Sequence, residues 1–408
     1  MGGDKLKRIL FKGDKIIWAV FFIICAISWV EVFSATSRQI SETENYWLPI
    51  IKHTAFLIGG VCVIFIMQNF ETKHIKKMSS FFYWLGLIGL IWAQFDSNSK
   101  INGSARWIDF GYFTIQPMEF AKMGLVMMTA KIMSEQQNEF GTNEGALKEI
   151  LKYSILPILI ILKENLSTAA LLIIALYMMM YIGKCPAKQL LQIAGLGICI
   201  GAIGITAILL TPESAASKEG GFGSKVVTWK HRLQAIGDNR QIDPDNYMID
   251  DDQRAHANMA IASSHFLGCG PGNSVQRDNI PHSYSDFIYA IIIEELGLVG
   301  GVVVLLLYLT FLYRSGKIAN RSKDAYSAYL AMGIGIIITL QAMLHMYISV
   351  GDFVTGQPLP LMSQGGTSVV INCIYIGMLL SISRHTHKNE PDITVNTAQV
   401  TTNKTEAL

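Results

Sequence analysis

The stretch SYSDFIYAIIIEELGLVGGVVVLLLYL, residues 283–309, indicates the fold class of the chain. Most of it is an apolar run long enough to cross a bilayer as a helix, which takes about 20 residues. It nevertheless carries three carboxylates, Asp286, Glu294 and Glu295, among Ile, Leu, Val and Phe. Ionised side chains are costly inside a membrane, so residues of this kind are rare there and are often functional.

The composition of the whole chain supports a membrane protein. Of its 408 residues, 51% are hydrophobic and only 16% are charged, whereas soluble chains have about 25% charged residues. The net charge of +2 is no sign of a nucleic-acid partner, and we expect none. The six cysteines are scattered, and only Cys269 falls in a clearly exposed loop. This spacing predicts neither a disulfide framework nor a metal cluster.

Ten apolar segments are candidates for transmembrane helices, so we predict an all-α, polytopic integral membrane protein. The segments are 15–35, 47–68, 80–96, 117–134, 150–163, 165–183, 189–211, 284–313, 325–350 and 359–383. The fifth and sixth are short and are separated only by the sequence KEN. We therefore expect these two to form a hairpin buried inside the bundle.

Basic residues in short loops predict the orientation, because such loops favour the cytoplasmic side. The N-terminal segment and the loops after the second and eighth helices are rich in Lys and Arg, and all fall on one side in a ten-helix count. We therefore predict that both termini are cytoplasmic. The predicted divisions are a cytoplasmic segment 1–14, a transmembrane domain 15–383 and a disordered cytoplasmic tail 384–408.

Two segments stand out on the predicted outer side. Residues 97–116 are too long for a simple turn, and residues 212–283 form a large extracytoplasmic loop between helices seven and eight. Loops of this length are usually functional or disordered. Within the loop 212–283, the sequences VVTWKHRLQAI and DQRAHANMAIASSHF have helical spacing of apolar residues. We expect partial order there, packed on the outer mouth of the bundle.

The three carboxylates separate if the helix continues unbroken through them. Glu294 and Glu295 would then lie about 12–14 Å deeper than Asp286, rotated from it by about 80° and 180°. Asp286 would face the outer mouth, either as a functional group or as a helix N-cap. The two glutamates would be buried in different directions, and we favour a structural role for them, neutral or paired across the bundle.

Several further charged residues lie near predicted helix ends. Glu119 and Lys122 are three residues apart and can pair along one helix. Lys163 and Glu164 lie at the predicted hairpin, where we expect structural polar contacts. From the residues alone, Arg106 and Trp107 are best explained as an anchor to lipid headgroups.

The loop FLGCGPGNSVQRDNIP, residues 266–281, is glycine-rich and contains Gln276 and Arg277. Backbone amides of such a loop could cradle phosphate, although a flexible linker explains the composition equally simply. The chain has no Walker A, Rossmann, HExxH or GxSxG motif, so ATP-driven transport and the common hydrolases have no support.

Four stretches in order carry a resemblance to a known family. They are GSARWIDFGYFTIQPMEFAK, KENLSTA, FLGCGPGNSVQRDNIPHSYSDFIYAIIIEELGLVG and TGQPLPLMSQGGTS. Over about residues 15 to 385 the chain resembles the SEDS family, the FtsW/RodA/SpoVE proteins of the bacterial plasma membrane. The N-terminal extension, the polar tail and the sequence VTWKHRLQAIGD are more similar to the cell-division branch, typified by FtsW, than to the elongation branch, typified by RodA.

The resemblance implies a peptidoglycan glycosyltransferase that polymerises Lipid II at the outer face of the membrane. It also implies a class B penicillin-binding transpeptidase as partner, with other divisome or elongasome membrane proteins. The family's essential aspartate corresponds to Asp286, as general base or as a ligand of a divalent cation such as Mg²⁺ or Mn²⁺. The implied substrate-binding residues are Arg106, Trp107, Glu119, Lys122, Gln276 and Arg277.

The sequence departs from the family pattern at several motif positions. His282 stands where the family has Glu, Tyr284 where it has His, and Gln364 where it has Tyr. Roles that the family assigns to those side chains therefore do not transfer directly. Two other classes of function stay open on the sequence: a flippase for a lipid-linked precursor, and a non-catalytic scaffold for a transpeptidase.

Overall fold

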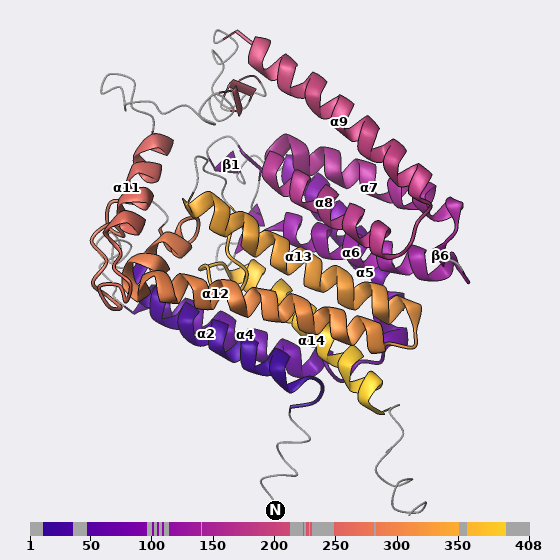
Figure 1. Ribbon diagram of the computed structural model, residues 1–408, viewed down its shortest axis with the longest axis horizontal. Coiled ribbons are helices and arrows are strands. Elements are labelled where there is room, and N and C mark those ends of the chain that lie inside the picture. Colours follow the sequence, from indigo (N-terminus) through magenta and orange to yellow (C-terminus); the bar gives the residue numbers. More distant parts are fainter. Residues whose placement is uncertain are drawn as a thin grey trace, which may run out of the picture.

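The computed structural model is almost entirely helical (Figure 1). It describes residues 11–35, 47–95, 100–101, 104–105, 108–109, 114–139, 141–212, 223, 226–227, 229–230, 249–280, 283–350 and 357–388. The helices are α2 (Lys15–Ala35), α4 (Leu48–Met67), α5 (Thr72–Phe95), α6 (Pro117–Glu135), α7 (Glu144–Glu164), α8 (Leu166–Ile182), α9 (Ala187–Leu210), α11 (Ile249–Ser263), α12 (Ile288–Arg321), α13 (Ala325–Val350) and α14 (Gly366–Lys388).

Six two-residue strands form three antiparallel pairs within the described residues. The strands are β1 (Lys100–Ile101), β2 (Ser104–Ala105), β3 (Ile108–Asp109), β4 (Thr114–Ile115), β5 (Gln137–Asn138) and β6 (Gly141–Thr142). The first four occupy the predicted outer segment 97–116, which is therefore structured and not a simple turn.

The predicted class, an all-α polytopic membrane protein, is confirmed, and each of the ten predicted spans contains a helix. Seven of the described helices are long and apolar enough to cross a bilayer. The three others among the ten are α6 and α7, which carry several charged residues, and α8, which has only 17 residues. Hydropathy alone underestimates α6 because Glu119 and Lys122 lower its score, although both are buried against protein rather than exposed to lipid.

Several predicted helix ends were wrong. α5 begins eight residues before the predicted span, and α12 extends to Arg321, because polar residues continue a helix beyond the apolar part that hydropathy detects. α7 likewise starts at Glu144. α14 starts at Gly366, since the two prolines at positions 358 and 360 disfavour helix before it. α14 also runs to Lys388, so the predicted tail 384–408 begins as helix, and its remainder lies outside the described residues.

α6, α13 and α14 form the centre of the bundle (Figure 1). α5 packs closely against α6 through two glycines. A Cβ at Gly86 would lie 2.6 Å from the Ala121 backbone, and one at Gly124 would lie 2.6 Å from the Tyr83 Cα. Small residues at such a crossing let two membrane helices approach, which increases their van der Waals contact.

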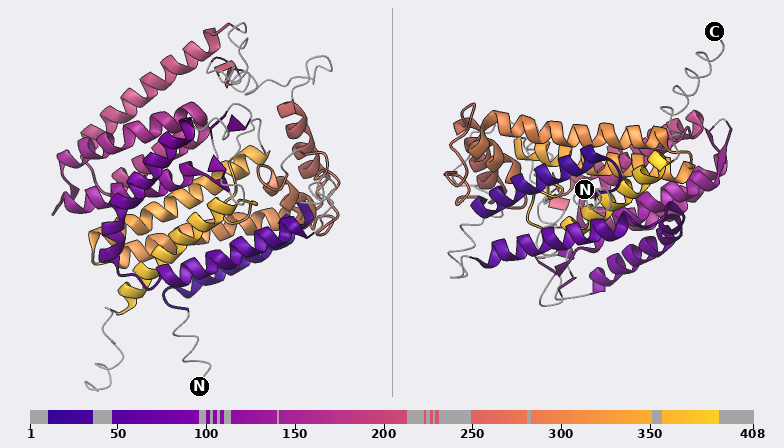
Figure 2. Two further views of the ribbon diagram at one scale, coloured as in Figure 1. Left: turned by 180° about the vertical axis from the view of Figure 1, so that it is seen from behind. Right: turned by 90° about the horizontal axis from the view of Figure 1, so that it is seen from below.

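The predicted hairpin of α7 and α8 is peripheral, and its burial inside the bundle was wrongly predicted. The two helices pack against each other, but Ile155, Leu159 and Ile174 are each about half exposed. α9 lies still further out, beside α7 and α8, as the view from behind also shows (Figure 2). Leu190 is the one buried residue of this helix. Apolar side chains on these outer helices suit contact with lipid.

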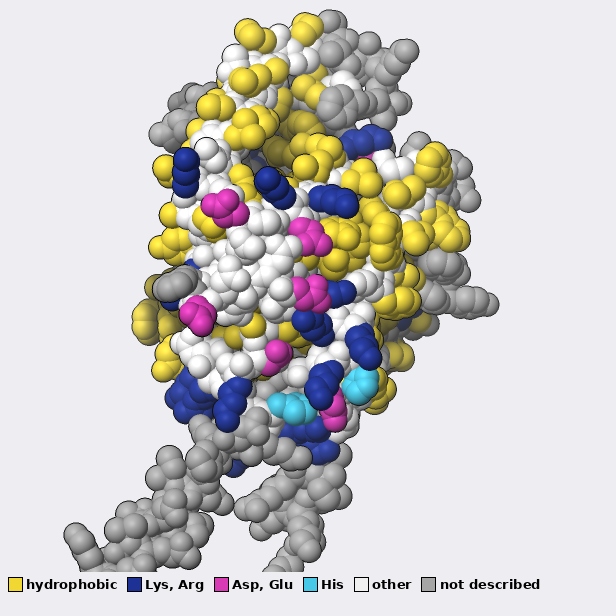
Figure 3. Space-filling model, turned by 90° about the vertical axis from the view of Figure 1, so that its right-hand side faces the viewer, with side chains coloured by type: hydrophobic (Ala, Val, Ile, Leu, Met, Phe, Trp, Pro, Cys, Tyr) yellow, Lys and Arg dark blue, Asp and Glu magenta, His cyan; other side chains and the backbone are white. Residues whose placement is uncertain are grey.

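The start of α2 and the end of α14 lie at the same end of the bundle, here called the basic end. Arg314 of α12 pairs with Asp14, which precedes α2, and Lys12 Nζ donates to Asn69 Oδ1 at 2.8 Å. Lys76 of α5 pairs with Glu135 of α6 at 3.4 Å. Figure 3 views this end, where Lys and Arg side chains gather. The described ends of the chain therefore share one face, as the ten-helix count predicts.

The opposite end, here called the Asp286 end, carries the described part of the large loop. α11 packs on α12, and the small core beneath it is formed by Ala257, Ile280, Phe287, Ala290 and Ile291. The predicted order in DQRAHANMAIASSHF is thus confirmed. Most of VVTWKHRLQAI lies outside the described residues.

Candidate functional site

Asp286 lies immediately before α12, at the point where the large loop meets the bundle. The N-cap of α12 is Phe287, which makes no side-chain capping bond, so the alternative that Asp286 is the N-cap was wrong. Phe287 is 1% exposed and anchors the chain in the core beneath α11. Asp286 itself is half-buried, and its Oδ1 accepts a hydrogen bond from Ser285 Oγ at 2.9 Å.

α12 is broken about three turns beyond Asp286, at Gly297, whose φ of 72° and ψ of −177° are not helical. The break leaves the carbonyls of Glu294 and Glu295 without their helical partners. Amides of the loop replace those partners: Cys269 N donates to Glu294 O at 3.0 Å, and Gly270 N donates to Glu295 O at 2.9 Å. The kink and the loop therefore satisfy each other's backbone polar groups.

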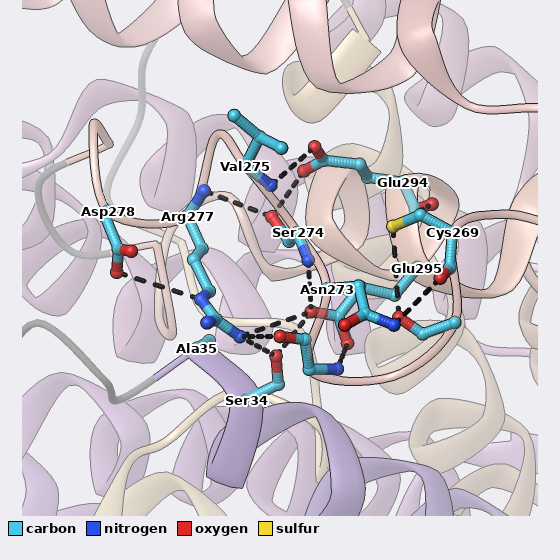
Figure 4. A network of polar contacts seen from close by, with 12 residues as sticks. Ser34, Ala35, Cys269, Asn273, Ser274, Val275, Arg277, Asp278, Glu294 and Glu295 are labelled. Carbon is cyan, nitrogen blue, oxygen red and sulfur yellow. Dashed lines mark hydrogen bonds and ion pairs between the residues drawn. The ribbon is translucent and has the colours of Figure 1, made fainter.

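The side chains of the same two glutamates also bind this loop (Figure 4). Glu294 accepts hydrogen bonds from Ser274 Oγ and from the amides of Val275 and Gln276, at 3.0 and 3.4 Å for the amides. Glu295 accepts from the amides of Gly272, at 3.0 Å, and Ser274, at 3.3 Å. Successive amides pointing one way form an anion-binding concavity, and here the bound anions are the protein's own carboxylates.

These contacts correct two interpretations of the sequence. The loop is not a flexible linker, and its amides at 272 and 274–276 are occupied by carboxylates rather than open to phosphate. Glu294 and Glu295 are 4% and 0% exposed, as expected, but they hold one loop instead of pointing to different parts of the bundle. The rotations of about 80° and 180° expected between Asp286 and the two glutamates do not apply, because Asp286 lies before the first residue of α12.

Arg277 joins this loop to α2. Its Nη1 donates to Ser34 Oγ at 2.9 Å and to Gly272 O at 2.7 Å, and it lies 3.8 Å from Glu295 Oε1. Ser34 Oγ in turn donates to Glu295. Figure 4 shows the guanidinium between the end of α2 and the loop. The contacts give the structural pairing that we expected for Glu295.

Glu31 was not among the candidates from the sequence. It lies one turn before Ser34 on α2 and is 0% exposed. Within the described residues, its two carboxylate oxygens have no hydrogen-bond partner. Glu31 could have been found in the same way as Glu294, because it is also an acidic residue inside an apolar run.

Glu119 and Lys122 form the predicted pair along α6. Their side chains are 5% and 2% exposed, and Lys122 Nζ lies 2.7 Å from Glu119 Oε1. Lys122 also donates to Gln341 Oε1 of α13 at 2.9 Å. Gln341 Nε2 in turn donates to Pro358 O at 3.1 Å. Pro358 lies at the start of the segment that precedes α14. The pair is therefore connected to residues 357–364 and not to the loop around Glu294.

Lys163 and Glu164 both contact Gln94 at the end of α5. Lys163 Nζ donates to Gln94 Oε1 at 2.7 Å, and Gln94 Nε2 donates to Glu164 Oε1 at 3.2 Å. They thus join α5 to the α7–α8 turn, away from the glutamate loop. Gln276 Oε1 accepts a 2.8 Å hydrogen bond from His256 Nδ1 of α11. Arg106, Trp107 and His282 lie outside the described residues.

Comparison with known proteins gives the family. The model of the FtsW/RodA/SpoVE family, described as "Cell cycle protein", matches residues 14–388. The chain belongs to this family. A protein of Thioalkalivibrio sulfidiphilus, named probable peptidoglycan glycosyltransferase FtsW, is 33% identical over 300 residues, 71% of this chain and 69% of its own length. A protein of the same name from Nitrosococcus halophilus is 28% identical over 378 residues, 89% and 90% of the two chains.

Solved structures of the FtsW/RodA/SpoVE type share the fold. A chain from a study of polymerization and crosslinking by a peptidoglycan synthase complex superposes with a TM-score of 0.70 at 19% identity, covering 92% of this chain and 99% of that one. The rod-shape-determining protein RodA of Thermus thermophilus gives 0.61 at 18% identity, covering 91% and 97%. The resemblance stated from the sequence is thereby confirmed.

The prediction of a divalent cation at Asp286 finds no ready ligand set. Among the residues that the structure describes, no group of three or more His, Cys, Asp or Glu is placed to hold a metal ion. Mg²⁺ and Mn²⁺ prefer several carboxylate or carbonyl oxygens and water. A cation on Asp286 therefore stays a prediction.

Proposed function

We propose that this protein is a peptidoglycan glycosyltransferase that polymerises Lipid II at the outer face of the plasma membrane, with Asp286 as general base. The observation that carries the proposal is the placement of Asp286: a half-buried carboxylate, fixed between a packed loop and a membrane helix, in a chain whose relatives bear that name. A site at the end of a membrane bundle suits a substrate with a lipid tail.

The reaction needs one proton acceptor. The hydroxyl of the acceptor sugar attacks the anomeric carbon of the donor; the bond from that carbon to the lipid pyrophosphate breaks as the glycosidic bond forms. The Asp286 carboxylate takes the hydroxyl proton, a contribution of about 10²–10⁴-fold in rate for a well-placed base. The departing pyrophosphate keeps the electron pair. Cationic side chains that offset its charge are proposed among Arg106, Lys122 and Arg277, with Trp107, Glu119 and Gln276 as further substrate contacts.

The alternative of a flippase depends on buried charges lining a path across the bilayer. Glu294 and Glu295 are instead engaged by a loop at one end of the bundle, and Lys163 binds Gln94 at the end of α5. These contacts favour the enzyme. We further propose a class B penicillin-binding transpeptidase as partner and the cell-division branch as the setting, since the similar FtsW proteins bear that branch's name.

Reconstitution tests the proposed activity directly. The purified full-length protein, with its class B transpeptidase, is expected to convert fluorescent Lipid II into long glycan chains without ATP. Gel separation of the products after digestion with a muramidase identifies the polymer. Proteoliposomes that move Lipid II between leaflets but yield no polymer would contradict the proposal and favour the flippase.

We also propose that the basic end is cytoplasmic and the Asp286 end faces outward, and Cys269 tests this. A membrane-impermeant maleimide should label Cys269 in right-side-out vesicles, and in inverted vesicles only after permeabilisation. Burial, with smaller contributions from the charges of Glu294 and Glu295, raises the pKa of the Cys269 thiol. Because the thiolate is the nucleophile, labelling should be slow at neutral pH and accelerate as pH rises. Cys269→Ser is the control, and labelling from the opposite side would reverse the topology.

A further inference from the structure

Residues 357–364 pass between α13 and α14 and lie directly against the backbone that precedes Asp286. Gln364 N donates to Tyr284 O at 3.0 Å, and Ser363 Oγ donates to Ser285 O at 2.7 Å. Two consecutive residues of this segment thus bind the two carbonyls immediately before the candidate base. Neither contact involves α12 or the glutamate loop.

The hydroxyl of Ser363 both donates and accepts a hydrogen bond in this position. It donates its one hydrogen to Ser285 O, and it accepts from Leu359 N at 2.8 Å. Ser363 is 2% exposed, so water does not offer ready replacements for either bond. Ser285 in turn donates its own hydroxyl to Asp286 Oδ1 at 2.9 Å. Ser363 therefore holds the backbone carbonyl of Ser285, and the hydroxyl of the same residue holds the carboxylate of Asp286.

The segment that carries Ser363 is held in one conformation. Leu361 has a φ of +64°, a conformation that non-glycine residues adopt only when their surroundings enforce it. The neighbouring carbonyls are bound from two helices: Tyr308 of α12 donates to Pro360 O, and Ser28 of α2 donates to Met362 O at 3.0 Å. Pro358 O is bound by Gln341, the partner of Lys122.

We propose that Ser363 is a positioning residue for Asp286. It fixes the Ser285 carbonyl, and Ser285 orients the carboxylate that accepts the proton. The proposal rests on the proposed function, because it assigns Ser363 an effect on the catalytic step of that same reaction. The buried pair Glu119–Lys122 is connected to the same segment, because Lys122 donates to Gln341 and Gln341 donates to Pro358 O.

The test is Ser363→Ala in the full-length protein with its transpeptidase partner. A misplaced base lowers the rate of the chemical step and leaves substrate binding intact, so kcat for Lipid II polymerisation should fall about 10- to 100-fold while KM stays within about twofold. Ser363→Thr keeps the hydroxyl and should restore kcat. Ser315→Ala is the matched control: it also removes a fully buried hydroxyl, one that donates only to Phe311 O in its own helix.

The outcomes separate this proposal from the proposed function. If Asp286→Ala is inactive and Ser363→Ala has unchanged kcat, the positioning role is wrong and the enzyme assignment stands. If Asp286→Ala retains full activity, the proposed function fails first. A fall in kcat that Ser363→Thr does not restore, or one matched by Ser315→Ala, would indicate general loss of packing and overturn the proposal. Should Ser363→Ala fail to fold, Ser363→Cys, similar in size but a weak donor, takes its place with the same expected fall in kcat.

Discussion

Asp286→Ala is expected to reduce Lipid II polymerisation by at least about 10²–10⁴-fold, below the detection limit of a gel assay, in a protein that still folds and binds its transpeptidase. Removing the carboxylate leaves the attacking hydroxyl without a proton acceptor. Asp286→Asn should be equally inactive, because an amide of nearly the same shape cannot take up the proton. Folding should survive in both, since Asp286 is half-buried and does not cap α12.

Asp278→Ala provides the matched control for this prediction. Asp278 belongs to the same loop, its side chain is 56% exposed, and it lies 3.7 Å from Arg277 Nε in an ion pair. Surface pairs of that kind contribute about 0–1 kcal/mol, so the variant should polymerise normally. Equal polymer yields from Asp286→Ala and the unchanged protein would contradict the role of Asp286 as base.

The helices of this protein could be predicted from sequence because the bilayer imposes a length and an apolar composition on each span. The predicted ends failed where that constraint stops. The start of α5, TKHIKK, and the end of α12, RSGKIANR, are polar, so hydropathy gives no signal although the residues continue a helix. The burial of α7 and α8 was mispredicted for a related reason: short apolar segments indicate membrane depth but not whether lipid or protein surrounds them.

The candidate site was predictable in its residues but not in its geometry. An acidic residue in an apolar run marked Glu294 and Glu295, yet only the fold brings Gly272 and Ser274 to them from some twenty positions earlier. Periodicity assumed an unbroken helix through Asp286, and the kink at Gly297 carries no strong local signal, because glycine is common in membrane helices. The role of Ser363 could not be predicted from sequence either, because its partner Ser285 is 78 residues away along the chain.

The kink itself predicts the largest effect on stability. Gly297 has φ 72° and ψ −177°, a region of backbone conformation that is essentially restricted to glycine. It also lies in close contact with the loop: a Cβ there would be 2.4 Å from Phe266 O and 2.5 Å from Gly268 N. Alanine would therefore have to change the backbone conformation and displace the loop that binds Glu294 and Glu295. We expect Gly297→Ala to cost about 3 kcal/mol or more, at the upper end for a single substitution.

The matched control for Gly297→Ala lies in the same helix. A Cβ at Gly316 meets nothing within 4 Å, so Gly316→Ala should be neutral or stabilise the protein by up to about 1 kcal/mol through helix propensity. Thermal unfolding of the two purified variants in one detergent measures the difference. Gly297→Ala should melt several degrees below the unchanged protein and Gly316→Ala at or above it. A closely packed backbone cannot accept a methyl group at 2.4 Å without losing contacts elsewhere. Coincident melting curves for the two variants would therefore contradict the close packing of the loop against the kink.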